Sequence, residues 1–286
     1  MKLKKLVAIT LSAVMCMAAL TGCGGKSDSA KKTAKVIEVD LTDEQYAFGV
    51  DKDQPDLLKE VNQFVKDMKS DGTFDEICNR YFGDGTPVPV KSAAYDESKD
   101  QLVVATNAAF EPFEYMDGEN YVGIDMEIAK ALADKLGKEL VIENMDFDAV
   151  CLSVGQHKCD IAMAGLTINE EREEYVTFSD PYYKASQRLV TLADDTAFDD
   201  CKDAASVEEV LKGLSASDKI GGQQGTTAQY FVEGSDDWGF EGLPAEWVPY
   251  KSASLAVQDM INGNLKYVLI DAAPAESITK AINAMQ

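Results

Sequence analysis

Short apolar runs alternate with amphipathic stretches over most of this chain, and this alternation restricts its fold more than any other feature. The runs at 102–106 ("LVVAT"), 139–143 ("ELVIE") and 160–165 ("DIAMAG") have the length and composition of buried strands. Between the first two runs, apolar side chains repeat at helical spacing, at Ile124, Ile128, Leu132 and Leu136. The order β-α-β-α-β predicts a mainly parallel sheet flanked by helices.

The same alternation recurs after residue 187. The runs at 219–223 ("KIGGQ"), 246–250 ("EWVPY") and 267–271 ("YVLID") are predicted strands. A capping-box pattern from Thr226 to Gln229 opens a predicted helix after the first of them. Two α/β units in succession predict two lobes with a cleft between them, and we place lobe 1 at 101–187 and lobe 2 at 188–286.

The first residues have the pattern of a secretory signal. Three lysines precede an apolar run at 6–20, which is shorter than the roughly 20 residues that a membrane span needs. We therefore predict a signal peptide at 1–22. The sequence that ends at Cys23 ("LTGC") resembles the lipobox of bacterial lipoproteins, which implies that this cysteine carries lipid such as palmitate and anchors the protein outside the cytoplasm. Residues 23–35 then form a flexible tether.

The segment at 36–83 cannot form a domain by itself. It contains two extended runs ("KVIEV" and "QYAFGV"), a helix opened by Pro55, and a short helix opened by a capping-box pattern at Thr73 and Glu76. Because so few elements cannot bury a core, we expect them to complete the two lobes. A Gly- and Pro-containing stretch at 84–100 reads as a surface linker.

Charge and cysteine content limit the partners. The formal charge is −23, and an acidic surface repels phosphate backbones, which argues against nucleic acid as a partner. The only histidine is His157 and no cysteine pair has metal-ligand spacing, so we expect neither a metal nor another cofactor. The cysteines other than Cys16 and Cys23 either form two disulfides or stay free thiols, and the sequence leaves both open for Cys78, Cys151, Cys159 and Cys201.

Seven stretches resemble, in the same order, the extracellular solute-binding proteins of bacterial amino-acid ABC importers. They are "NAAFEPFEY", "GIDMEIAKALADKLG", "MDFDAV", "DIAMAGLTINEER", "VTFSDPYY", "QQGTTAQ" and "VLIDAAPA", and together they cover nearly all of 102–282. The resemblance implies a two-lobed α/β fold of the type II periplasmic-binding-protein kind. It also implies a binding protein, not an enzyme, which delivers a free amino acid to the permease and ATPase subunits of an importer.

The order of the segments departs from that family. The stretch at 41–83 resembles the segment that comes last in the family, yet here it comes first. We therefore expect a circularly permuted chain, in which 84–100 joins the former ends of the fold. Permutation is tolerated where the ends are close together and exposed. The alternative is a helical appendage at 36–83 that matches by accident.

A buried zwitterion needs an anion site and a cation site, since an unpaired buried charge costs several kcal/mol. Arg172 follows "GLTINEE" at an expected strand-to-helix turn, where a guanidinium can form two hydrogen bonds to a carboxylate. By resemblance, Gly165, Thr167, Thr226 and Thr227 add backbone and hydroxyl contacts at the same end of the ligand. The alternative for Arg172 is a surface ion pair with a neighbouring glutamate.

The remaining predicted contacts serve the ammonium group and the side chain of the ligand. Asp271 ends a buried strand and is the predicted partner of the ammonium, with a helix N-cap as the alternative. By resemblance, Phe110 and Phe147 flank the ligand's side chain, although core packing is the usual role of phenylalanine. Asn107 and Gln223 match positions at the distal end of that side chain.

The ligand's side chain is less constrained than its amino-acid end. Asn107 stands where relatives for cationic amino acids may place an acid, which favours an uncharged polar ligand such as glutamine or cystine. A basic amino acid stays open, because Glu111 or Glu114 would restore an acid if either turned inward. A ligand that contacts both lobes favours the closed form, and the expected hinges are near 41–47 and 184–190.

Two rival functions share these features. The same fold resembles certain dehydratases of cyclohexadienyl acids, with a cleft carboxylate such as Glu111 or Glu114 as general acid, and related lobes occur ahead of signalling modules. An amino-acid clamp explains the motifs, and no nucleophile–base pairing is visible, so catalysis is the less favoured reading. No apolar run long enough to span a membrane follows the lobes, which argues against a sensory input domain.

Overall fold

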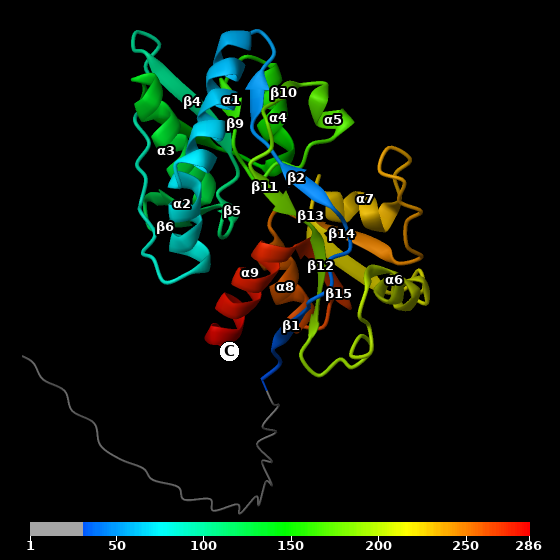
Figure 1. Ribbon diagram of the computed structural model, residues 1–286. Coiled ribbons are helices and arrows are strands. Elements are labelled where there is room, and N and C mark those ends of the chain that lie inside the picture. The colour runs from blue at the N-terminus through cyan, green and yellow to red at the C-terminus, as the bar shows by residue number, and fades with distance from the viewer. Residues whose placement is uncertain (1–30) are drawn as a thin grey trace, which may run out of the picture. The chain divides into compact units, whose positions relative to one another are not determined.

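The computed structural model describes residues 31–286, of which Lys32–Gln286 form one compact unit. The predicted signal peptide and Cys23 lie outside the described residues. Two five-stranded sheets with helices packed on them make up this unit (Figure 1). We call the sheet that contains β4 (Gln101–Thr106), with its helices, lobe 1, and the sheet that contains β13 (Lys219–Gln223), with its helices, lobe 2. The predicted two-lobed α/β fold is confirmed.

In the sheet of lobe 1, β4 has a neighbouring strand on each side. All six of its residues are buried, as expected for a strand that is not at an edge. The strand order is β10 (Val176–Phe178), β3 (Gly49–Asp51), β9 (Ile161–Ala162), β4 and β8 (Glu139–Asn144). β4 pairs parallel with β8 and β9, whereas β3 pairs antiparallel with β9 and β10. A separate three-stranded sheet joins β5 (Ala109–Phe110), β6 (Glu114–Asp117) and β7 (Asn120–Val122).

The helices of lobe 1 come from both ends of its sequence. They are α1 (Pro55–Ser70), α2 (Thr73–Phe82), α3 (Ile124–Leu136), α4 (Phe147–Gly155) and the short α5 (Glu170–Glu173). Pro55 occupies the first turn of α1, as predicted, where its missing N–H costs nothing. The face of α1 that carries Val61, Phe64, Val65 and Met68 is buried, and α2 packs between α1 and α3. The two N-terminal helices therefore belong to the core of lobe 1.

The sheet of lobe 2 follows the order β1 (Ala34–Ile37), β12 (Gln187–Leu192), β15 (Tyr267–Asp271), β13 and β14 (Glu246–Tyr250). Its helices are α6 (Ala204–Lys212), α7 (Thr227–Glu233), α8 (Ala253–Ile261) and α9 (Ala272–Met285). β13 pairs parallel with β14 and β15, whereas β12 pairs antiparallel with β1 and β15. Each sheet is thus mixed and not mainly parallel, because segments that cross between the lobes run against the direction of the βαβ units.

Two short strands connect the lobes. β2 (Glu44–Tyr46) and β11 (Tyr183–Ala185) pair antiparallel and lie side by side between the two larger sheets (Figure 1). Each belongs to a stretch that leaves one lobe and enters the other, at the places where the sequence predicts hinges. A pair of extended crossings can bend through small backbone changes without disturbing either core.

Both predicted capping boxes are wrong in detail. Gly72, in a left-handed conformation, precedes α2 at the N-cap position, so Thr73 is already the first helical residue and its side chain caps nothing. Thr226 does occupy the N-cap position of α7, yet its hydroxyl donates to the carbonyl of Gln223 at 2.7 Å. Gln229 Oε1 accepts from the backbone N–H of Gly225 at 2.9 Å, so neither half of the second box forms.

The last helix lies against the first described strand. Asn283 on α9 accepts a hydrogen bond from the backbone N–H of Ala34 at 2.9 Å and donates to the carbonyl of Ala34 at 2.8 Å. These residues are 249 positions apart in the sequence. Figure 1 shows the end of α9 beside β1. The C-terminal residues and the start of β1 are therefore neighbours in space.

Within residues 31–286, Cys78, Cys151, Cys159 and Cys201 are all free thiols, which decides between the two alternatives left open by the sequence. Burial raises the pKa of Cys78 to about 12, so this thiol stays protonated near neutral pH. Among the described helices, none has the length and apolar character of a membrane span.

Candidate functional site

Arg172 lies where the two lobes meet, between α5 of lobe 1 and the start of α7 of lobe 2. No other arginine of the described residues lies there. Asn169, at the N-cap position of α5, accepts from the Arg172 backbone N–H at 2.8 Å and fixes the local turn. The guanidinium donates to the carbonyl of Thr167 in lobe 1 at 2.6 Å and to the carbonyl of Gly225 in lobe 2 at 3.0 Å. The side chain is buried and forms no ion pair with any carboxylate of residues 31–286, so the alternative of a surface ion pair is wrong.

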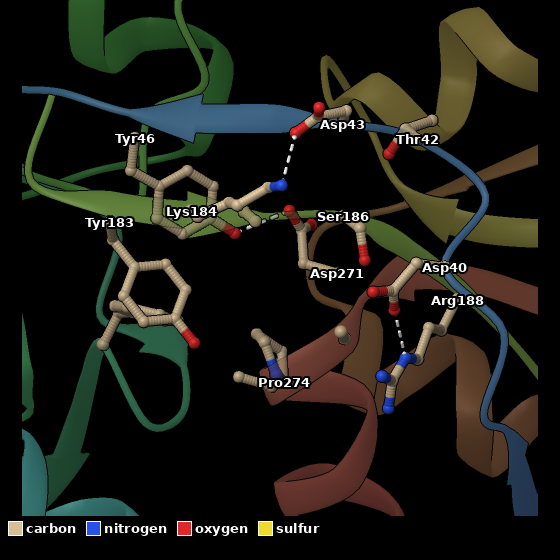
Figure 2. Close-up of a pocket in the computed structure, with 14 residues that line it drawn as sticks. Asp40, Thr42, Asp43, Tyr46, Tyr183, Lys184, Ser186, Arg188, Asp271 and Pro274 are labelled. Atoms are coloured by element: carbon tan, nitrogen blue, oxygen red, sulfur yellow. Dashed lines mark hydrogen bonds and ion pairs between the residues drawn. The ribbon is translucent and has the colours of Figure 1, made fainter.

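Asp271 is the second charged residue of the predicted site, and it belongs to lobe 2. It occupies the N-cap position of α9 but makes no capping hydrogen bond. Its Oδ1 instead accepts from the hydroxyl of Tyr46 on β2 at 2.6 Å (Figure 2). Burial, reinforced by the negative charge of Glu44, raises the pKa of Asp271 to about 7. The carboxylate is therefore held in a place where a positive partner would stabilise its ionised form.

Position 165 requires glycine for two reasons, its backbone conformation and the lack of space for a side chain. Its φ is +53°, in the left-handed region, and a Cβ there would lie 3.0 Å from the Phe110 ring. Its N–H donates to Asp125 at 2.9 Å, so that group is already paired, and only its carbonyl remains for a ligand. Burial raises the pKa of Asp125 to about 6.

The predicted side-chain contacts form a second bridge across the cleft. Gln223 of lobe 2 donates to the Asn107 side chain of lobe 1 at 2.8 Å, and Asn107 donates to the carbonyl of Met145 at 2.6 Å. The Arg172 guanidinium lies 5.1 Å from the centre of the Phe147 ring. This distance fits a cation–π contact, so Phe147 also holds the arginine in place.

These residues enclose one small cavity between the lobes. Nine of the ten predicted ligand-binding residues line it: Phe110, Phe147, Gly165, Thr167, Arg172, Gln223, Thr226, Thr227 and Asp271. Its volume is about 10 Å³, close to what a single water molecule occupies. An amino acid is much larger, so the lobes must separate before one can enter.

A larger cavity, of about 460 Å³, lies on the other side of Asp271 (Figure 2). Aromatic rings of Tyr46 and Tyr183 and the side chain of Pro274 border it. Its cations are already paired, Lys184 with Asp43 at 3.3 Å and Arg188 with Asp40 at 2.7 Å. Of the ten predicted ligand-binding residues, only Asp271 lines it.

Neither glutamate that was expected to restore an acid lines the small cavity. Glu111 is half-buried, and burial raises its pKa. Glu114 is fully buried in lobe 1, and neither of its oxygens has a hydrogen-bond partner among the described residues. Burial, with the charges of Asp125 and Asp271, raises the pKa of Glu114 well above its usual range, which favours the neutral form of this side chain.

One further cluster contains potential metal ligands. His157, after α4, places Nδ1 2.8 Å from Asp51 Oδ2 and Nε2 3.6 Å from Asp53 Oδ2. The shorter distance is that of a hydrogen bond, and this bond raises the pKa of His157. The pair ties the end of β3 to the turn after α4, and we assign it a structural role.

The sequence interpretation missed two residues of β2. Glu44 is buried and accepts hydrogen bonds from Thr167 in lobe 1 at 2.7 Å and from Thr227 in lobe 2 at 2.8 Å. Tyr46, on the same strand, holds Asp271. Their positions two residues apart on one extended strand place both side chains on the same face, but only the fold shows that this face meets the cleft.

Comparison with known proteins assigns the family. Residues 9–84 and 102–273 match the bacterial extracellular solute-binding proteins, family 3. The chain belongs to this family. Its architecture is the type II periplasmic-binding-protein fold, and its named relatives are substrate-binding proteins of ABC transporters, not enzymes.

Several relatives of this solute-binding protein, and several solved structures similar to it, are named as amino-acid-binding proteins. The arginine-binding extracellular protein ArtP of Bacillus subtilis is 34% identical over 146 residues, 51% of this chain and 53% of ArtP. An ancestral arginine-binding protein bound to glutamine is 33% identical, with a TM-score of 0.53 over 64% of this chain and 74% of that one. The ancestral amino acid-binding protein AncCDT-1, a precursor of cyclohexadienyl dehydratase, is 27% identical, with a TM-score of 0.54 over 73% and 78%. AncCDT-1 is thus named as a binding protein.

These matches are partial. The chain spans about half of ArtP and 63% of the histidine-binding periplasmic protein of Escherichia coli K12. The family match is interrupted between residues 84 and 102, which is the predicted linker.

Proposed function

We propose that this solute-binding protein captures a free amino acid outside the cytoplasm and delivers it to the permease of an ABC importer. The observation that carries the proposal is the small cavity, because Arg172 of lobe 1 and Asp271 of lobe 2 both line it. A guanidinium and a carboxylate on opposite walls match the two charges of a zwitterion. The family assignment and the names of the relatives support the same function.

Capture would proceed by closure of the lobes. In the described structure Arg172 donates to a carbonyl of each lobe, and a ligand carboxylate is the stronger acceptor for the same donors. Thr167, Thr226 and Thr227 lie at the same end of the cavity. A ligand bound between the lobes contacts both, so it stabilises the closed form over the open one.

The ligand class follows from size and charge. Gln223 offers an amide group for a polar side chain, as glutamine or cystine would need, whereas Asn107 does not line the cavity; Phe110 and Phe147 offer apolar walls. The relatives named for arginine and histidine add a basic amino acid to this class. Glu111 and Glu114 do not line the cavity, so an acid for a basic side chain must come from elsewhere.

A thermal-shift screen of the chain from residue 26 onward tests this function. The common L-amino acids, with cystine, ornithine and citrulline, would be added one at a time. A ligand at about 100 times its Kd stabilises the folded state by roughly 2.7 kcal/mol, which raises the Tm by a few degrees. We expect a clear shift with one or a few polar or basic amino acids. A complete absence of shifts would contradict an amino-acid-binding function.

The membrane anchor belongs to the same proposal. Cys23 in its lipobox-like context would carry the lipid, and residues 23–35 would tether the lobes to the membrane. Radiolabelled palmitate should enter the wild-type protein in cells and should not enter a Cys23→Ser variant. Equal labelling of the two proteins would rule out Cys23 as the lipid site.

We also infer that the chain is a circular permutant of its family. Asn283 on α9 bonds both backbone groups of Ala34, so a short connection from 286 to 33 would give one continuous path through lobe 2. The segment at 84–100 instead crosses the surface of lobe 1, where Val90 pairs with Tyr121. The interruption of the family match in this same segment supports the inference.

Reordering the chain tests the permutation. A variant that begins at Gln101, joins Gln286 to Thr33 through a short glycine–serine linker and ends at Asp100 keeps every helix and strand of both lobes and the contacts of 84–100, such as Val90 with Tyr121. We expect it to fold and to bind the same amino acid within about threefold of the wild-type Kd, because the cleft residues are unchanged. Calorimetry and thermal melts would measure this. An unfolded product would count against the inference.

A further inference from the structure

Glu44 is a buried acid at the cleft that the amino-acid clamp described so far does not use. It lies on the crossing strand β2 and is only 2% exposed. Its Oε2 accepts from Thr167 Oγ1 and Thr227 Oγ1, and its Oε1 accepts from Gln187 Nε2 at 3.0 Å and Thr42 Oγ1 at 2.5 Å. Four donors thus converge on one carboxylate.

All four donors are uncharged. No lysine or arginine of residues 31–286 forms an ion pair with Glu44. Gln187, which is fully buried, also lies within hydrogen-bonding reach of Asp271, and its own Oε1 has no donor among the described residues. The two acids are therefore hydrogen-bonded by neutral donors but have no cation beside them among the described residues, and a buried negative charge without a cation is unstable.

The charges at the cleft do not balance for a neutral ligand. Arg172 contributes one positive charge, whereas Asp271 and Glu44 offer two carboxylates. An amino acid with an uncharged side chain adds no net charge and leaves one negative charge in excess. A ligand with one additional positive charge, such as a basic amino acid, removes the excess.

We propose that Glu44 is a positioning residue that makes this cleft select amino acids of net positive charge. The proposal rests on the function proposed above. Glu44 does not line the small cavity itself, so it acts through Thr167 and Thr227, which do.

Glu44 also links this charge to closure. Thr167 belongs to lobe 1 and Thr227 to lobe 2, yet both donate to the same oxygen of Glu44. Separation of the lobes must break at least one of these bonds. The acid is therefore fully held by its partners only when the two lobes meet.

L-arginine and L-citrulline test the charge directly, because they have nearly the same shape and differ in the charge of the side chain. Calorimetry at pH 8 would compare wild type with Glu44→Gln, both from residue 26 onward. We expect wild type to bind arginine at least about tenfold more tightly than citrulline. Glu44→Gln should lose about tenfold for arginine and less than about threefold for citrulline.

Two further variants separate charge from structure. Glu38→Gln removes an exposed acid from the preceding segment and should leave both affinities unchanged. Thr227→Val removes one hydrogen bond to Glu44 without a change of charge, so it should weaken both ligands by a similar factor. Thermal melts without ligand would show whether each variant is folded.

The outcomes are distinct. An equal loss for both ligands in Glu44→Gln would show a role in closure only and would overturn charge selection. Equal wild-type affinity for arginine and citrulline would overturn it as well, without any variant. If neither ligand binds but another amino acid shifts the Tm, the inference fails and the proposed function stands; if no amino acid does, the function itself fails.

Discussion

Arg172→Ala is expected to weaken amino-acid binding at least about 30-fold. The guanidinium is buried, spans both lobes and is the only arginine that lines the small cavity. Without it the ligand carboxylate would be buried unpaired, and the loss of one partner of a buried charge pair costs roughly 2 to 5 kcal/mol. Isothermal titration calorimetry with the amino acid found in the thermal-shift screen would measure the change.

Two variants control this experiment. Arg80→Ala removes another lobe 1 arginine, which pairs with Glu76 and Glu127 and lines neither cavity, so the affinity should not change. Arg172→Lys keeps the charge but loses the planar pair of donors, and we expect an intermediate loss. A loss below about threefold in Arg172→Ala would remove this residue from the site.

Asp271→Asn should abolish most ligand binding and yet stabilise the ligand-free protein at alkaline pH. The pKa of Asp271 is raised to about 7 from an ordinary value of 3.8, because burial and the charge of Glu44 disfavour the ionised form. A raised acid contributes stability below pH 4, and this stability is lost as the pH rises through about 7. Asparagine cannot ionise, so it avoids this loss.

In Asp271→Asn, the Tm of the ligand-free protein and the affinity for the amino acid should therefore change in opposite directions. At pH 8 without ligand, we expect the variant to have a higher Tm than wild type, and below about pH 4 the difference should be small. Its affinity for the amino acid at pH 8 should fall at least about 30-fold, since the ligand ammonium loses its partner. Asp199→Asn, at an exposed pair with Lys35, should change neither quantity. A lower Tm at pH 8 would mean that the ionised carboxylate is well solvated in the fold.

The opposite effects of Asp271→Asn on stability and on affinity illustrate why binding-site residues reduce the stability of the ligand-free fold. Asp271 and Glu44 are buried, and neither forms an ion pair with a cation of residues 31–286. Such groups weaken the ligand-free fold and become favourable only when a positive ligand arrives. Substitutions here should separate stability from affinity, whereas substitutions in the apolar core should lower both.

Local sequence patterns predicted elements better than their ends. The alternating apolar runs at 102–106, 219–223 and 267–271 are strands in the structure, and Pro55 opens a helix as predicted. Short-range interactions determine these features, because periodicity and proline geometry act within one element. Both capping boxes failed, since a pattern of two residues does not specify which one enters the helix first. Gly72 decided the matter at α2.

The mixed sheets were not predictable from the runs alone. β3 and β1 come from the N-terminal segment and pair antiparallel with strands more than 100 residues away. Strand direction in such a pair depends on where the chain crosses between lobes, and no local pattern encodes it.

The sequence by itself determined the α/β class, the family and the set of residues that surround the small cavity, because motifs of this length are specific and lie at the ends of predicted strands. Only the tertiary structure revealed Glu44 and Tyr46 as parts of the cleft. Hydrogen bonds between residues more than 100 positions apart depend on the approach of two lobes. That approach is set by the packing of the whole chain, which no short stretch of sequence contains.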